Sequence, residues 1–126
     1  MSNEVKYFTP KEAARTLPLV RKIVEDILKE GKAVRDMIAS RGVEYRTEPP
    51  VLKKIELVRK YLEELSSIGC IYKDWNFTFG LIDFPSVIDD EEVYLCWRSD
   101  ESDVLFYHGI EDGYAGRKPI PDIYFI

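Results

Sequence analysis

The stretch Val93–His108 (VYLCWRSDESDVLFYH) contains two runs of β-branched, aromatic and apolar residues on either side of a polar segment. Runs of this composition are typical of strands, and a polar segment of five residues has the length of a hairpin connection. We therefore expect strands at Val93–Arg98 and Val104–His108, joined by a loop at Ser99–Asp103.

The two faces of this expected hairpin differ in composition. Because side chains alternate between faces along a strand, a symmetric hairpin places Trp97 opposite Leu105 and Leu95 opposite Tyr107 on an apolar face that can pack on helices. The second face carries Tyr94, Cys96, Arg98, Val104, Phe106 and His108. This second face is too apolar to be fully exposed to solvent and too polar to be part of a hydrophobic core, so a functional site is expected there.

Two further strands precede the hairpin. The acidic run Asp89–Glu92 forms a turn, Gly80–Phe84 reads as a second strand and Cys70–Tyr72 as a short first one. The second part of the chain, residues 70–126, is therefore predicted to be an antiparallel meander of three to four strands followed by a tail.

The first part of the chain has the pattern of a long helix. Thr9, Pro10 and Glu12 form a capping box with proline at the first helical position. Apolar residues then recur at alternating spacings of three and four, which predicts a helix to about Ala39: Leu17, Val20, Val24, Ile27, Val34 and Ile38. Pro18 is expected to kink this helix, and Gly31 is expected to allow a second helix to approach closely.

A second helix is predicted after Pro49-Pro50. Its apolar positions repeat the same spacing, and Gly69 provides a stop: Val51, Ile55, Val58, Leu62 and Leu65. The connection around Gly42 is short, so the two helices should form an antiparallel hairpin over residues 1–69. A coiled coil with a partner chain is the alternative. The whole chain, 1–126, is predicted to be a single α+β domain, with the long helical hairpin packed on the meander.

Composition excludes several classes of function. The net charge of −5 combines +3 on residues 1–69 with −8 on residues 70–126, and the acidic part also has 12 of the 16 aromatic residues. Such charge disfavours nucleic acid as a partner. No apolar run approaches the ~20 residues of a membrane span, and Met1–Glu4 has no basic region leading into an apolar one. Cys70 and Cys96 do not make a disulfide framework, so we expect a cytoplasmic protein.

Several segments resemble the domain-of-unknown-function family 2203 of bacteria and archaea. The matching residues are Phe8-Thr9, Glu12-Ala13, Leu17-Pro18, Gly80–Pro85, Val93–Arg98, Tyr107-His108, Gly113–Arg117 and Pro119. Ala14 departs from the pattern, since relatives often have asparagine there. The resemblance implies a single domain and supplies no mechanism.

His108, the only histidine, is the first candidate for chemistry. As a general base or metal ligand it could act with Asp83, Glu111 or Asp112, and a divalent metal would be the implied cofactor. Candidate catalytic residues are His108, Asp83, Arg98 and Glu111; candidate metal ligands are His108, Glu111 and Asp112. The alternative is a strand-end histidine that forms a structural hydrogen bond to a carboxylate or a carbonyl.

Basic residues near two glycines suggest a site for a small anionic ligand. Candidate ligand-binding residues are Arg98, Arg117, Gly113 and Gly116. Arg98 either pairs with Asp83 across strands or binds the anion, depending on the strand register. The run Gly113–Lys118 either cradles the anion with its backbone N–H groups or forms a turn in which Tyr114 covers the sheet.

The end of the chain and the central cysteine complete the predictions. Cys96 has Arg98 two residues away on its face but is expected to be a buried structural thiol. The apolar tail Ile120–Ile126 should dock on its own sheet or on a partner chain. The leading hypothesis is a homodimeric, non-enzymatic interaction or scaffold module. The rival is a small-molecule or metal-dependent enzyme with its site around His108, Asp83 and Arg98.

Overall fold

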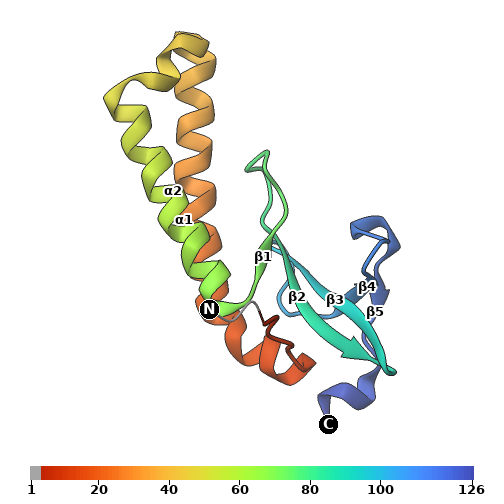
Figure 1. Ribbon diagram of the computed structural model, residues 1–126. Helices are drawn as coiled ribbons and strands as arrows, with labels where there is room; N and C mark the ends of the chain where they lie inside the picture. Colours follow the sequence, from red (N-terminus) through yellow and green to blue (C-terminus); the bar gives the residue numbers. More distant parts are fainter. Residues whose placement is uncertain (1–3) are drawn as a thin grey trace.

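The computed structural model describes residues 4–126 and combines a helical hairpin with a five-stranded sheet (Figure 1). Residues Met1–Asn3, part of the segment expected to carry no leader, lie outside the described residues. The helices are α1 (Pro10–Arg41) and α2 (Pro49–Ile68), with 3-10 helices at Val43–Thr47, Tyr114–Gly116 and Asp122–Phe125. The strands are β1 (Ile71–Tyr72), β2 (Leu81–Ile88), β3 (Glu91–Arg98), β4 (Phe106–Gly109) and β5 (Lys118–Pro119).

The predicted capping box begins α1. The Thr9 hydroxyl accepts from the Glu12 backbone N–H at 3.1 Å, and the Glu12 carboxylate accepts from the Thr9 N–H at 3.2 Å. Pro18 lies inside the helix, and Figure 1 shows the first turns of α1 set at an angle to the remainder. The direction changes where proline removes a backbone hydrogen bond.

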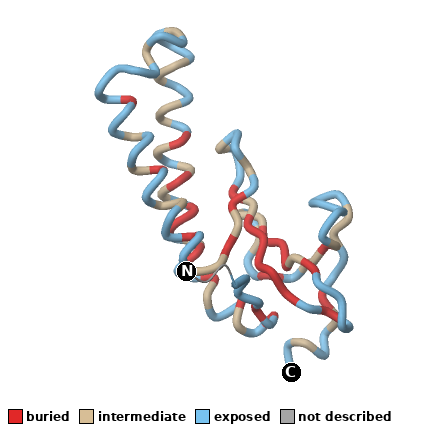
Figure 2. The backbone as a smooth tube through the Cα atoms, viewed as in Figure 1, coloured by how far each residue is buried: buried red, intermediate tan, exposed pale blue. Residues whose placement is uncertain are grey.

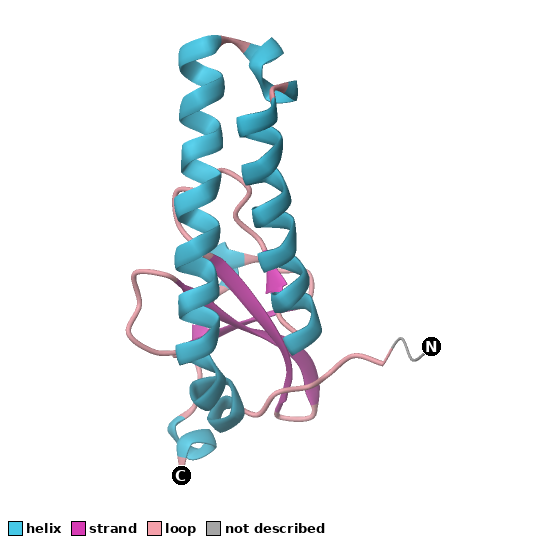
Figure 3. Ribbon diagram, turned by 90° about the vertical axis from the view of Figure 1, so that its left-hand side faces the viewer, coloured by secondary structure: helices cyan, strands magenta, loops and turns pink. Residues whose placement is uncertain are grey.

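The two helices pack on each other within the chain, as the hairpin prediction requires. Lys54 of α2 forms an ion pair with Glu30 of α1 at 2.9 Å, and Gly69 ends α2 in the left-handed conformation at φ 108°. Figure 3 shows the helices side by side over one face of the sheet, with the end that joins them extending beyond it.

All neighbouring strands are antiparallel, in the order β1-β2-β3-β4-β5. Asp89 and Asp90, at φ 51° and 65°, form a two-residue turn that pairs Ile88 with Glu91. β2 is longer than predicted and includes Pro85. The short fifth strand was not singled out in the sequence, because two residues carry no periodic pattern.

The sheet turns its apolar face to the helices, as predicted. Buried residues concentrate where the hairpin faces β2 and β3 (Figure 2). Ile82, Phe84, Leu95 and Trp97 belong to one core cluster with residues of α1 and α2. The expected facing of Val104 and Leu105 is wrong: Val104 is buried in this core and Leu105 is exposed, because β4 begins only at Phe106 and strand alternation does not apply before it.

Gly31 provides space for an aromatic ring rather than for the second helix. A Cβ at Gly31 would lie 2.2 Å from Cδ1 of Phe77, which belongs to the β1–β2 connection. The prediction that a second helix requires this glycine is therefore wrong. The close approach of Phe77 accounts for an unfavourable helix residue at this position.

The tail docks only in part. Ile120 is buried, and the Tyr124 hydroxyl donates to the Asp89 carboxylate at 2.7 Å. Ile123 and Ile126 are 71% and 87% exposed. Among the described residues, no helix is both long and apolar enough to cross a membrane.

The contact between Gly31 and Phe77 can be tested by a double-mutant cycle. We expect Gly31→Ala to lower the free energy of unfolding by about 1–2 kcal/mol, because the new methyl group overpacks against the ring. In a Phe77→Ala background the same change should be neutral or stabilising, since alanine is the better helix former. Chemical denaturation measures all four proteins. Equal destabilisation in both backgrounds would contradict the assigned contact.

Candidate metal centre

The register of the sheet gathers polar side chains on the face away from the helices. Asp83 of β2 lies opposite Cys96 of β3, and His108 of β4 lies opposite Tyr94. Because alternate residues share a face, Asp83, Cys96, Tyr94 and His108 all lie on the same side of the sheet. This is the face on which the sequence predicted a functional site.

Three of these side chains form a buried cluster. Asp83, Cys96 and His108 are only 3%, 2% and 4% exposed. One carboxylate oxygen, the thiol sulfur and one ring nitrogen lie within 4.8 Å of one another. Donor atoms around one zinc ion lie about 3–4 Å apart, so small side-chain movements would bring these three to one cation.

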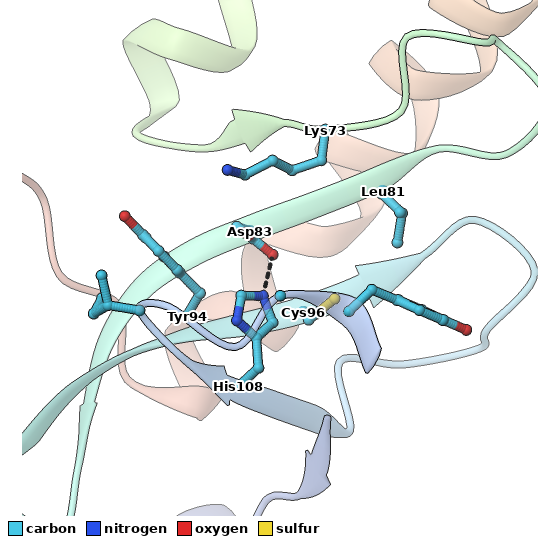
Figure 4. A pocket seen from close by; sticks show the side chains of 9 residues that line it. Lys73, Leu81, Asp83, Tyr94, Cys96 and His108 are labelled. Carbon is cyan, nitrogen blue, oxygen red and sulfur yellow. Dashed lines mark hydrogen bonds and ion pairs between the residues drawn. The ribbon is translucent and has the colours of Figure 1, made fainter. Parts of the chain in front are cut away.

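The hydrogen bonds of His108 orient its ring toward the cluster (Figure 4). Nδ1 lies 2.8 Å from the backbone carbonyl of Gly109, and Nε2 lies 3.1 Å from Oδ1 of Asp83. A carbonyl can only accept, so Nδ1 carries a hydrogen. The contact between Nε2 and Oδ1 of Asp83 is then a hydrogen bond only when one of those two atoms carries a further hydrogen, whose place a bound cation would take. Metal-bound histidines commonly donate their second ring N–H to a carbonyl, which leaves Nε2 to bind the cation.

Cys96 is not an activated nucleophile in this setting. Burial raises the pKa of its thiol to about 12, and the neighbouring Asp83 adds to the effect. A reactive cysteine needs a lowered pKa, so the thiol by itself is unsuited to nucleophilic catalysis near neutral pH. A bound cation would change this, because metal coordination deprotonates a thiol. The expected structural thiol is thus also a candidate ligand.

The cluster opens on a pocket of about 140 Å³. Its lining consists of Lys73, Leu81, Asp83, Tyr94, Cys96, His108, Ile110, Gly113 and Tyr114. Ile110, Gly113 and Tyr114 come from the β4–β5 connection, which covers this face. Asp112 fits closely within that connection: a Cβ at Gly109 would lie 2.5 Å from its carboxylate oxygen, and one at Gly116 would lie 2.6 Å from its Cβ.

Arg98 does not pair with Asp83. It faces Leu81 across the strands and makes two hydrogen bonds of 2.6 Å to Asp100, whose carboxyl pKa is lowered as a result. A third hydrogen bond of 2.9 Å runs to the Tyr114 hydroxyl. Pairing with Asp83 would require a turn centred one residue later, because moving the turn by one residue shifts every partner by two.

The other predicted site residues lie apart from the cluster. Arg117 forms an ion pair with Glu101, and its guanidinium lies over the Phe106 and Tyr114 rings at 4.1 and 4.7 Å. Glu111 and Asp112 are exposed and do not join the cluster. Gly113 alone of the predicted anion-binding residues lines the pocket. The Gly113–Lys118 run forms a turn, and Tyr114 packs over the sheet beside the two arginines, as the structural alternative proposed.

Sequence reasoning missed three contributors to this site. Cys96 was considered as a thiol but not as a metal ligand, and Lys73 and Tyr94 were not considered as pocket residues. For Cys96 and Tyr94 the signal lay in the turn: with Asp89 and Asp90 at its centre, the register places Asp83 opposite Cys96 and Pro85 opposite Tyr94. Lys73 lies opposite Leu81 through the separate pairing of β1 with β2, which this turn does not set. Aspartate tolerates positive φ, so this position of the turn could have been weighed.

The fold and the cluster define a class: a small α+β protein with a helical hairpin on one face of an antiparallel sheet and ligand-type side chains on the other. The chain belongs to the family described as an uncharacterized conserved protein (DUF2203), whose profile matches residues 6–120. This confirms the resemblance in the sequence. No curated protein and no solved structure shows a significant match to the chain.

The raised thiol pKa leads to a test by alkylation. Burial raises the pKa of both Cys70 and Cys96 to about 12, so at pH 8 the thiolate is about a thousandfold rarer than in the unfolded chain. We expect iodoacetamide to modify metal-free native protein at least about a thousandfold more slowly than the same protein in guanidinium. Mass spectrometry gives the rate at each cysteine.

The raised pKa of the two thiols also makes the free energy of unfolding depend on pH. Unfolded thiols ionise near pH 9 and folded ones near pH 12, so only the unfolded chain releases protons in this window, and the free energy of unfolding should fall as pH rises above 9. Rapid alkylation of Cys96 by iodoacetamide in the native protein at pH 8 would contradict the raised thiol pKa.

Proposed function

We propose that this protein is a metal-dependent enzyme acting on a small molecule, with Asp83, Cys96 and His108 as ligands of one divalent transition metal. The observation that carries the proposal is the convergence of three ligand-type side chains, from three adjacent strands, at the base of a pocket. This corresponds to the alternative enzyme hypothesis from the sequence, with Asp83 and Cys96 as ligands in place of Glu111 and Asp112 and without Arg98 in the site.

The donor set favours zinc or a similar ion. One sulfur, one imidazole nitrogen and one carboxylate oxygen are the donor types that zinc takes, and imidazole with thiolate disfavours magnesium or calcium. Three protein ligands leave one position of a tetrahedron open, which is the pattern of catalytic rather than structural zinc. The pocket lies beside the cluster, so a water or substrate would take that position.

The chain contributes positioning and a dry environment. A bound metal of this kind would supply Lewis acidity and a more acidic water. Strands β2, β3 and β4 set the separation of the ligands, and the Gly109 carbonyl orients His108. The Tyr94 ring lies tilted beside the His108 ring at 5.7 Å between centroids, and His108 itself is 4% exposed.

Metal titration tests the proposal. Protein stripped with a chelator should bind about one equivalent of Zn²⁺ or Co²⁺, and the Co²⁺ form should show a thiolate charge-transfer band. His108→Gln and Cys96→Ser should each weaken binding at least about a hundredfold. Glu111→Gln is the matched control, since this exposed acid was a candidate ligand by sequence; it should bind like the natural protein.

Circular dichroism and thermal melts separate loss of ligand from loss of fold in these variants. Absence of stoichiometric Zn²⁺ or Co²⁺ binding by the folded natural chain would refute the metal centre. So would equal weakening by Glu111→Gln.

A homodimeric interaction module is the second candidate, and the exposed tail favours it. Ile123 and Ile126 are the most exposed of the large apolar side chains in the described residues, and exposed apolar patches often mark interfaces. A dimer would cover them. Both cysteines are free and buried, which supports a reducing, cytoplasmic location.

Native mass spectrometry tests the dimer. Ile123→Asp combined with Ile126→Asp should convert dimers to monomers that remain folded by circular dichroism, because the side chains face solvent in a single chain. Val43→Asp, at a 58% exposed site at the far end of the hairpin, is the control and should leave the dimer intact. A natural protein that is monomeric at micromolar concentration would sink this candidate.

A further inference from the structure

We infer that the pocket accepts a small carboxylate, a monoanion, and that Lys73 supplies the opposite charge that binds it. This inference rests on the proposed metal centre and names the class of substrate for that site.

Lys73 is the basic residue that lines the pocket, and its charge is not neutralised. Its Nζ lies 5.8 Å from the centroid of the Tyr94 ring and makes no ion pair within residues 4–126. Figure 4 shows its side chain extending along the pocket above Asp83. A cation over an aromatic face retains its attraction for an anion, because the ring offers no formal charge.

The other charged side chains near Lys73 already have partners of their own. Asp74, next to Lys73 in the chain, accepts the backbone N–H groups of Asn76 and Phe79 at 3.0 and 2.8 Å. Arg98 and Arg117 pair with Asp100 and Glu101. Lys73 therefore remains as the side chain able to offer positive charge to a ligand here.

The charge count at the metal centre selects a monoanion. A divalent cation bound by the Asp83 carboxylate and the Cys96 thiolate has no net charge, so the metal would not draw in an anion by charge alone. Lys73 adds a single positive charge to the pocket. One carboxylate balances it, whereas a phosphate monoester would bring a second negative charge that no basic side chain lining the pocket matches.

The size and lining of the pocket restrict the rest of the ligand. A volume of about 140 Å³ is well below the ~300–1,000 Å³ of pockets for drug-sized molecules. Leu81 and Ile110 give it apolar walls, with Tyr94 and Tyr114 as aromatic ones. The ligand is thus a carboxylate with a short apolar body rather than a polar or extended chain.

The backbone fixes the place of Lys73. Its N–H donates to the Leu81 carbonyl at 2.8 Å and continues the β1–β2 pairing by one residue. This puts Lys73 on the same face as Asp83, across from Leu81. Its side chain reaches the pocket from the residue that follows β1, while the proposed metal ligands come from β2, β3 and β4.

Co²⁺-loaded protein gives a direct test with propionate as the probe and propionamide as its neutral counterpart. Propionate should alter the visible Co²⁺ spectrum in a saturable way, and propionamide should not. Lys73→Met should weaken propionate binding about tenfold, because a charged hydrogen bond is lost at a partly exposed site, while Co²⁺ binding should be no weaker, since the substitution removes a positive charge near the cation. Lys73→Arg should restore most of the binding.

Lys118→Met is the matched control, since Lys118 is an exposed lysine of the same sheet that does not line the pocket; its propionate affinity should equal that of the natural protein. If Co²⁺ binds but Lys73→Met leaves propionate affinity unchanged, the inference fails and the metal centre stands. Tighter binding of inorganic phosphate than of propionate would also overturn it. A protein that binds no Co²⁺ would overturn both proposals.

Discussion

The two-residue turn at Asp89-Asp90 is the constraint on which the rest of the sheet depends. Both residues have positive φ, and the turn pairs Ile88 with Glu91, which then fixes every pair between β2 and β3. A turn of this type follows the right-handed twist of the strands, so the pairing extends over eight residues on each side. A shift of the turn by one residue would preserve the apolar face and yet separate Asp83 from Cys96. The core alone therefore does not specify the cluster; the turn does.

The sheet has two covered faces, and each is covered by different means. The helical hairpin buries the apolar side, while the β4–β5 connection covers the side with Asp83, Cys96 and His108. Burial of an aspartate and a histidine is unfavourable unless each has a partner, and here they are partners of one another at 3.1 Å. The three polar side chains thus lie buried at the base of a small, partly open pocket rather than on a flat surface.

Much of the fold was predictable from the sequence, because its signals are local. The capping box at Thr9, the apolar stripe of each helix and the alternation around Trp97 depend on neighbouring residues, and the structure has these elements. The site was predictable only in part. The sequence singled out His108 and Asp83 but assigned Glu111 and Asp112 as ligands in place of Cys96, because proximity across strands depends on register, which one residue in a turn decides. The contact between Gly31 and Phe77 is equally non-local. The sequence pattern singled out Gly31 as an unusual helix residue, but nothing in the sequence indicated that Phe77 would contact it.

The three cluster residues lie close in sequence as well as in space. Thirteen positions separate Asp83 from Cys96 and twelve separate Cys96 from His108. Bringing them together closes only two hairpin loops, each with a small entropic cost, and requires no contact with the helices. The three side chains can therefore come together once β2, β3 and β4 pair. A cation bound at the proposed centre would cross-link these three strands, and metal supply would then influence the stability of the sheet as well as its chemistry.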